Sequence, residues 1–567
     1  MSKDDMTNRI TFPLTEETSL LFSDDFVEYL LHMHDTFSGQ VETLRLARQA
    51  TLVRAHREGI CVLRTSPADK NINDWSIGPL PEELRRPGIE ISGPASITRM
   101  FINAINPSQN GIRAVGYLDD DEDSGGHSLQ STLDSTLNRL NAVEGNLTYR
   151  DELRNRDYAV VDGKLPFFMH RERGLHLDEP EVLIDKRPIC AAILGTALTL
   201  YYAGQAQIRN NQGVYFYLPK LESASESKFY RDFFDATRQH LHIPDHGIIK
   251  AIILIESLPA VFQMDEMLYS LGEYAAGLNA ARWDLKASII EYIMPDPNMV
   301  WPDRFEVDIK TTEFLSAIFR RLIAICQQRD AVAIGGMATA LPSPDEEINK
   351  IAATSIREDK EWEAEQGFIR GWAAHIYHME TASAPFQKKD IAQATSHEGF
   401  TNYVDPIRID VPVGIVSLEG TRRNIRTLIE YLEGWMNGRG AKSIDNMQGE
   451  KGKRPALMED LATARISVGQ IAQRIIHAAV CEETGKTHTF SLIKLLGEKE
   501  LESILRYQEM LHENHDQSRA KLDRERYDTS LKIAFQWIKN YTRYDFRSLA
   551  SYSREELQSI GQDNPAF

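Results

Sequence analysis

From about residue 88 onward, short apolar runs alternate with polar turns and helical stretches. The runs are GIRAVGYL, LPFFMH, GVYFYLP, GIIKAIILI, YAAGLNAARWD and DAVAIG. This alternation predicts a parallel α/β sheet. Charged residues follow the runs, as at the active-site face of a (β/α)₈ barrel. A doubly wound sheet would alternate in the same way, but no GxGxxG follows the first run, so we favour the TIM barrel.

The segments on either side of this alternation have helical periodicity. Residues 15 to 60 carry apolar positions at helical spacing in FVEYLLHMH and VETLRLARQATLVRA. After about residue 415 the β-rich runs stop, and TRRNIRTLIEYLEGWM and ESILRYQEMLHE are amphipathic. We therefore predict an N-terminal helical segment over 1–87, the barrel over 88–414 and an all-helical C-terminal domain over 415–567.

Composition excludes several classes of protein. The formal net charge of -19 argues against a nucleic-acid partner. The cysteines lack the spacing of a disulfide framework or a zinc site; they are Cys61, Cys190, Cys326 and Cys481. The start MSKDDMTNRI has no signal-peptide core, and the end NPAF is no peroxisomal signal. The apolar run 189–202 is shorter than the roughly 20 residues that a membrane span needs and predicts a buried helix. We expect a cytoplasmic enzyme that does not enter a membrane.

Two acids follow apolar stretches in a way that indicates a metal site. Glu256 follows GIIKAIILI, and Asp284 ends YAAGLNAARWD about one βα unit later. If both follow barrel strands, their carboxylates meet at the same mouth. Carboxylates without His or Cys partners suit Mg²⁺. Spacing alone leaves open that either acid lies in an exposed loop.

Three further sets of charged residues have alternative interpretations. The acidic run after GIRAVGYL is either a solvated turn or a group of side chains behind a metal. Arg171 and Arg173 could stabilise an anionic oxygen or form surface ion pairs. Asp460 is typical of a helix N-cap, but it could also be a base. The acids concerned are Asp120, Asp121, Glu122 and Asp123.

Several motifs, taken together, resemble the malate synthase family. The segment GIIKAIILIESLPAVFQMDEMLYSLGEYAAGLNAARWD is similar to the core of that family. RERGLHLDEP, GVYFYLPKLES, AIGGMATALP and LMEDLATARIS match in the family's order. The similarity runs from DWSIGPLPEELRRPG to the helices after residue 460.

The resemblance implies a role for each matching position. It places Mg²⁺ ligands at Glu256 and Asp284, and catalytic groups at Arg171 and Asp460. It also implies substrate contacts from the acidic segment and from backbone N–H groups of the metal loop. Those substrate-binding positions are Asp120, Glu122 and Trp283.

The implied reaction is a Claisen-type condensation of acetyl-CoA with glyoxylate, followed by thioester hydrolysis to malate and CoA, as in the glyoxylate cycle. The chain departs from the family at Leu285, at Arg465 and in an insertion, DNMQGEKGKRPA. These departures leave two alternatives open. One is a related condensing or lyase enzyme that uses another acyl-CoA and 2-oxo acid. The other is an inactive paralogue with a binding role.

Overall fold

A closed barrel of parallel strands forms the centre of the protein. The computed structural model describes residues 8–64, 75–125, 127–388, 407–444, 455–511 and 517–562. Within these residues eight strands close in the order β10-β11-β12-β13-β2-β3-β6-β9, which confirms the predicted TIM barrel. The strands are β2 (Gly88–Pro94), β3 (Gly116–Asp120), β6 (Phe167–Arg171), β9 (Val214–Leu218), β10 (Ile249–Leu254), β11 (Ala275–Asn279), β12 (Val332–Ala338) and β13 (Arg370–Ala373).

The barrel strands are buried on both faces because helices cover the outside. Side chains that fill the interior include Met169, Tyr217, Leu254 and Trp372. A continuous apolar run is therefore the expected strand signal. The covering helices are α4 (Thr98–Ile105), α5 (Leu129–Glu144), α8 (Ala224–His240), α10 (Met264–Leu271), α11 (Arg282–Ile293), α12 (Glu313–Gln328), α13 (Glu346–Gln366) and α14 (Met379–Gln387).

The N-terminal segment is helical, as predicted. It contains α2 (Glu16–Leu21) and the long α3 (Asp24–Glu58), which packs along α8 and α6 (Ala191–Thr199). Helix α6 begins inside the apolar run 189–202 and is wholly buried, so that prediction is also confirmed. A small antiparallel sheet of β1 (Ile10–Thr11), β7 (Asp178–Ile184) and β8 (Arg187–Cys190) joins the N-terminus to the barrel.

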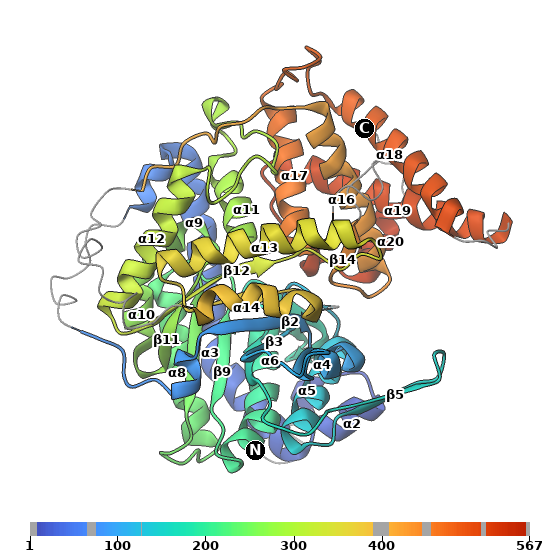
Figure 1. The fold of residues 1–567 in the computed structure, drawn as a ribbon. Helices are drawn as coiled ribbons and strands as arrows, with labels where there is room; N and C mark the ends of the chain where they lie inside the picture. Colours follow the sequence, from blue (N-terminus) through green and yellow to red (C-terminus); the bar gives the residue numbers. More distant parts are fainter. Residues whose placement is uncertain are drawn as a thin grey trace.

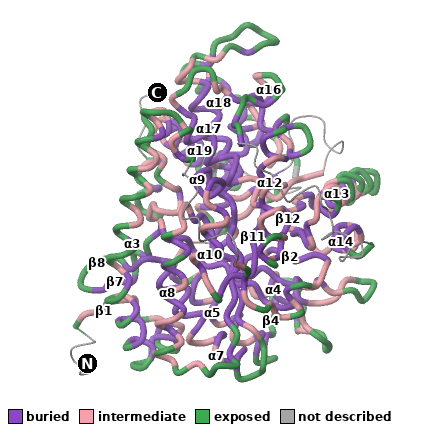
Figure 2. Tube along the Cα trace, turned by 90° about the vertical axis from the view of Figure 1, so that its left-hand side faces the viewer, coloured by how far each residue is buried: buried purple, intermediate pink, exposed green. Residues whose placement is uncertain are grey.

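The C-terminal region is a group of helices that lies against one side of the barrel (Figure 1). Helix α17 (Leu461–Ile476) packs on barrel helix α11. The group also contains α16 (Leu418–Met436), α18 (Phe490–Leu511), α19 (Gln517–Tyr541) and α20 (Arg554–Gln562). Figure 2 shows buried chain continuing from the barrel into α17, so the two regions share a packed interface.

The expectation that strands stop after about residue 415 is wrong. An antiparallel pair forms between β14 (Lys442–Ile444) and β15 (Leu457–Glu459). Strands of three residues are too short to produce a periodic pattern. The pair brackets the DNMQGEKGKRPA insertion, of which residues 445–454 lie outside the described residues. Leu457 also bridges to Ala340, just after β12, so this pair fixes the chain that leads into α17.

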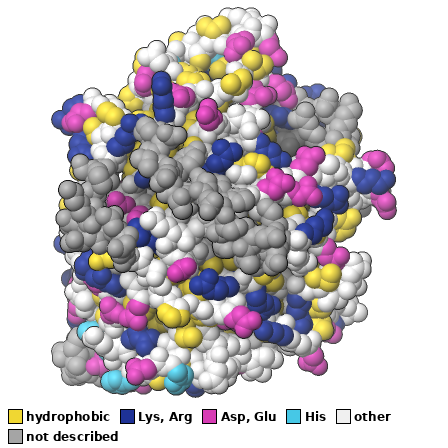
Figure 3. Space-filling view, turned by 60° about the vertical axis from the view of Figure 1, so that its left-hand side comes forward, with side chains coloured by type: hydrophobic (Ala, Val, Ile, Leu, Met, Phe, Trp, Pro, Cys, Tyr) yellow, Lys and Arg dark blue, Asp and Glu magenta, His cyan; other side chains and the backbone are white. Residues whose placement is uncertain are grey.

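The outer surface mixes charges. Figure 3 shows acidic and basic side chains interspersed over the described part of one face. None of the described helices is long and apolar enough to cross a membrane.

A buried ion pair ties the two ends of the barrel sequence together. Arg370 Nε on β13 donates to Glu90 Oε1 on β2 over 2.8 Å, and neither side chain is exposed. Tyr217 and Trp372 donate to the other oxygen, Oε2, over 2.7 and 3.2 Å. The Glu90 carboxylate is therefore satisfied inside the barrel.

Replacing Glu90 with Leu should destabilise the barrel strongly. Arg370 would then be a buried cation without an acid partner, which costs about 3–5 kcal/mol. The midpoint of urea unfolding, followed by far-UV circular dichroism, measures this loss. Lys350→Ala, which removes an exposed pair with Glu347, is the control and should change stability by less than about 1 kcal/mol. Equal midpoints for the two variants would contradict the assignment.

Candidate active site

The register between β3 and β6 brings a carboxylate and a guanidinium together. Asp120 and Arg171 are paired residues of these strands. Arg171 Nε donates to Asp120 Oδ1 over 2.7 Å and Nη2 donates to Oδ2 over 2.8 Å. Arg171 Nη1 lies 3.2 Å from Asp123 Oδ2. Arg171 is therefore held at the carboxyl end of its strand as a fixed cation, and the surface ion-pair interpretation is wrong because Arg171 and Arg173 are both buried.

The acidic run 119–123 is buried, so its interpretation as a solvated turn is also wrong. Its side chains divide into two groups. Asp119 and Asp121 lie beside Arg139 of α5, at 2.6 and 3.3 Å. Asp120, Glu122 and Asp123 face Arg171 and Lys220 instead. The first group therefore pairs with Arg139 outside the barrel strands, and the second with Arg171 and Lys220 at their carboxyl ends.

Lys220 is the hub of the second group. Its ammonium donates to Glu122 Oε2 over 2.7 Å, to Asp123 Oδ1 over 2.9 Å and to Asp284 Oδ2 over 3.0 Å. Its backbone N–H donates to Glu256 Oε1 over 2.5 Å. We call these four acids, Glu122, Asp123, Glu256 and Asp284, the carboxylate cage. Sequence patterns alone did not single out Lys220, although a lysine directly after the run GVYFYLP was a usable signal.

The structure brings Glu256 and Asp284 together from different kinds of element. Glu256 follows β10, as predicted, whereas Asp284 does not end a strand. Strand β11 stops at Asn279, and Asp284 lies in the first turn of α11. Ala281 supplies no side-chain cap to that helix, so its first N–H groups depend on other partners. Trp283 is half-buried in the same turn, with the Lys286 ammonium 4.4 Å from its ring.

Asp460 reaches the cage from the C-terminal region. It is the N-cap of α17, and its Oδ1 accepts the N–H of Thr463 over 3.2 Å. Burial raises the pKa of Asp460 to about 8, helped by the like charges of Asp123 and Asp284. Burial also raises the pKa of Glu256 to about 7, against the lowering effect of Lys220. Asp460 is therefore the predicted N-cap, and it also lies near enough to Asp123 and Asp284 for their charges to raise its pKa.

A second residue of α17 also contacts the cage. Arg465 Nη1 donates to Asp284 Oδ1 over 2.6 Å. Its Nη2 donates to both oxygens of Glu291 on α11, which in turn accepts from the Tyr541 hydroxyl over 2.8 Å. Arg465 is one of the positions at which this sequence differs from the family that it resembles. Its contacts link α17, α19 and α11 at the edge of the cage.

The carboxylate oxygens of the cage are suitable ligands for a hard cation, although in this structure they surround the ammonium group of Lys220. Among the described residues, no three His, Cys, Asp or Glu side chains are already arranged as a metal set. Three carboxylates instead surround Lys220 Nζ, so this position stabilises a positive charge. Glu122 Oε1 is buried without a hydrogen-bond partner. Carboxylate oxygens suit Mg²⁺, provided that the flexible Lys220 side chain moves aside.

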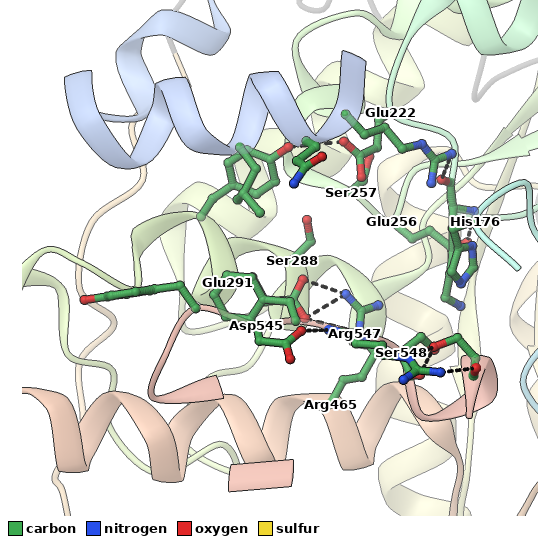
Figure 4. Close-up of a pocket in the computed structure, with 18 residues that line it drawn as sticks. His176, Glu222, Glu256, Ser257, Ser288, Glu291, Arg465, Asp545, Arg547 and Ser548 are labelled. Atoms are coloured by element: carbon green, nitrogen blue, oxygen red, sulfur yellow. Dashed lines mark hydrogen bonds and ion pairs between the residues drawn. The ribbon is translucent and has the colours of Figure 1, made fainter. Parts of the chain in front are cut away.

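A cavity opens beside the cage between α3, α11 and the C-terminal region. It has a volume of about 440 Å³ and includes Lys220 and Glu256 in its wall. Figure 4 shows His176 and Glu256 close to each other in the view, with Arg547 and Ser548 elsewhere along the cavity. Its basic side chains are Arg48, Lys220, Arg465 and Arg547. The cavity therefore offers cations along a path to the cage.

Replacing Lys220 with Met should destabilise the protein and make that stability depend on Mg²⁺. Without the ammonium, the buried acids of the cage repel one another, at a cost of about 3–5 kcal/mol. A divalent cation would replace the lost charge, and binding to the folded state stabilises it. Thermal midpoints with and without MgCl₂ measure both effects. Lys228→Met, at an exposed pair with Asp232, is the control. If Mg²⁺ raised the thermal midpoint of Lys220→Met no more than that of wild type, the cage would not be a cation site.

Two family profiles match the chain over ranges that include Arg171, Lys220, Glu256, Asp284 and Asp460 but not the acidic run 119–123. The profile "Malate synthase, TIM barrel domain" matches residues 167–402, and "Malate synthase, C-terminal" matches residues 416–553. Among solved structures, RipC from Yersinia pestis is 17% identical with a TM-score of 0.30, covering 55% of this chain and 99% of its own. That score is too low to bear on fold or function.

Curated relatives match over most of their lengths. A malate synthase of Myxococcus xanthus is 35% identical over 75% of this chain and 76% of its own. Malate synthase A of Escherichia coli is 33% identical over 86% and 89%. A glyoxysomal malate synthase of Ricinus communis is 33% identical over 78% and 76%. The barrel, the helical C-terminal region and these matches together make the chain a member of the malate synthase family.

Proposed function

We propose that this protein condenses acetyl-CoA with glyoxylate and hydrolyses the resulting thioester to malate and CoA. The observation that carries the proposal is the meeting of four groups from separate elements. Glu256 and Asp284 lie around Lys220, and Arg171 pairs with Asp123 of the same cage. Asp460, at the start of α17, lies near Asp123 and Asp284. An inactive paralogue would not be expected to retain all four groups.

Glu256 and Asp284 are the residues that would hold Mg²⁺. A divalent cation there would polarise the glyoxylate aldehyde and neutralise its carboxylate. The first-turn N–H groups of α11, at Trp283 and Asp284, offer donors for the glyoxylate carboxylate. Glu122 and Asp120 stay predicted substrate-binding residues. In this structure the Asp120 oxygens accept from Arg171 and from the Glu122 and Ser124 N–H groups.

Asp460 and Arg171 divide the first chemical step. Asp460 removes a methyl proton from acetyl-CoA, the electron pair of that C–H bond forms the C=C bond of an enolate, and the π pair of the carbonyl moves to the thioester oxygen. Arg171 stabilises the negative charge that develops there, because it is fixed before the reaction begins. A raised pKa makes Asp460 a stronger base once it is ionised.

We propose that the cavity beside the cage takes the acyl-CoA. Arg48, Arg465 and Arg547 are cations in its wall, and phosphate groups pair with arginine. The other lining residues include Leu52, Tyr292 and Phe546, which offer apolar contact to a pantetheine chain. The thioester end would then lie toward Glu256.

Mg²⁺-dependent release of CoA, detected with a thiol reagent, tests the reaction. Wild type should release CoA from acetyl-CoA only when glyoxylate is added, and malate should accumulate. Arg171→Ala should lower kcat about 10²–10³-fold, the usual loss for one oxyanion donor. Arg154→Ala, an exposed arginine outside the site, is the matched control and should match wild type.

The substrate pair is tested by the same assay with a panel of acyl-CoAs and 2-oxo acids. If CoA were released faster with another pair, that pair would be the substrates in place of acetyl-CoA and glyoxylate, and the proposed class of reaction would stand. No release from any pair would rule out a condensing enzyme.

The pH dependence of kcat should follow Asp460. Because burial raises its pKa, the carboxyl group holds its proton below about pH 8 and cannot act as a base there. We expect kcat to rise with pH to a plateau, with half-maximal rate near the pKa of about 8. Asp460→Asn should abolish turnover at every pH, as measured by CoA release. A flat profile through this range would exclude Asp460 as the titrating base.

A further inference from the structure

His176 is a cavity residue to which the proposed function gives no role. It lies in the loop after β6, beyond Arg171 and Arg173. It lines the cavity beside the cage together with Lys220 and Glu256, and also a second cavity of about 740 Å³. A histidine in the wall between two cavities is in a position to contact a ligand in the first of them.

Gly174 determines how the His176 ring lies. A Cβ atom at position 174 would meet Nδ1 at 2.7 Å and Cε1 at 2.9 Å. The ring therefore lies back over the Gly174 backbone, and only a residue without a side chain leaves room for it. Nδ1 is buried there without a hydrogen-bond partner. Nε2 makes no hydrogen bond to a described residue and is the ring nitrogen left for a ligand.

His176 is neutral in this setting. Burial lowers the pKa of the imidazole well below its usual value, and the cations Arg48, Lys220 and Arg465 lower it further. A neutral imidazole carries one N–H and can donate it without giving up the proton. A neutral histidine can polarise a substrate carbonyl by donating its N–H to the oxygen. The surrounding cations also favour a bound group that gains negative charge.

We propose that His176 Nε2–H donates a hydrogen bond to the thioester carbonyl oxygen of the acyl-CoA. This inference rests on the proposed function, since it assumes that an acyl-CoA occupies the cavity. When Asp460 takes the methyl proton, the π pair of the carbonyl moves onto that oxygen. His176 keeps its proton and shares the stabilisation of the enolate with Arg171. Arg171 is the last residue of β6 and His176 lies five residues further along, in the loop that leaves this strand.

Variants at two positions test this hydrogen bond. His176→Phe removes the N–H, whereas His176→Gln places an amide N–H near the position of Nε2. Gly174→Ala keeps the histidine but pushes its ring away. His375→Phe, at a histidine that lines a different cavity, is the matched control. Thermal midpoints confirm that each variant is folded.

The direct readout is the ¹³C chemical shift of [1-¹³C]acetyl-CoA bound to the Mg²⁺-loaded protein. A hydrogen bond moves the carbonyl signal downfield relative to free acetyl-CoA. We expect that displacement in wild type and His375→Phe, its loss in His176→Phe and Gly174→Ala, and partial rescue in His176→Gln. The kcat of His176→Phe should fall about 10²–10³-fold.

An undisplaced carbonyl signal in wild type, or a full displacement in His176→Phe, would overturn the inference. The proposed function fails by a different result, the absence of malate from wild type. A His176-dependent displacement without malate would leave the hydrogen bond standing and reject the reaction. Malate formation with a displacement that does not depend on His176 would do the reverse.

Discussion

The site depends on the compensation of buried negative charge. Glu122, Asp123 and Asp284 are all buried, and an ionised carboxylate can only accept hydrogen bonds. Isolated carboxylates would not stay ionised in such a place. The Lys220 ammonium lies within 3.0 Å of an oxygen of each acid and so makes their approach possible. These three ion pairs hold together the loops after β3 and β9 and the first turn of α11.

The same compensation joins the barrel to the C-terminal region. Asp284 has one oxygen held by Lys220 of the barrel and the other by Arg465 of α17. Arg465 lies about one and a half helical turns after Asp460, so its ion pair also sets the height of Asp460 above the cage. Docking of α17 and assembly of the site are therefore a single event. A protein in which α17 lifted away would lose its proposed base and expose Asp284 together.

The sequence predicted those strands that are marked by an apolar run of neighbouring residues. Apolar runs located six of the barrel strands, and Glu256 follows one of them directly. The four-residue β13 begins with Arg370 and gave no such signal, because its charge is neutralised by Glu90, 280 positions away in sequence. The predicted strand before Asp284 was also too long, because the apolar run continues past the end of β11 into α11. The β11–α11 turn lies between Asn279 and Arg282, and no proline or glycine marks it.

The sequence could not assign a role to residues whose surroundings are side chains distant in the sequence. Lys220 and His176 are ordinary residue types in ordinary contexts until the barrel closes. The acidic run was open to interpretation as a solvated turn, because nothing local reveals Arg139 or Arg171 beside it. Asp460 illustrates why both of its interpretations hold. Its capping bond to Thr463 lowers its pKa, but burial and the nearby acids raise the pKa more. An N-cap that lies near other acids is consequently also a candidate base, because its surroundings raise the pKa of its carboxyl group.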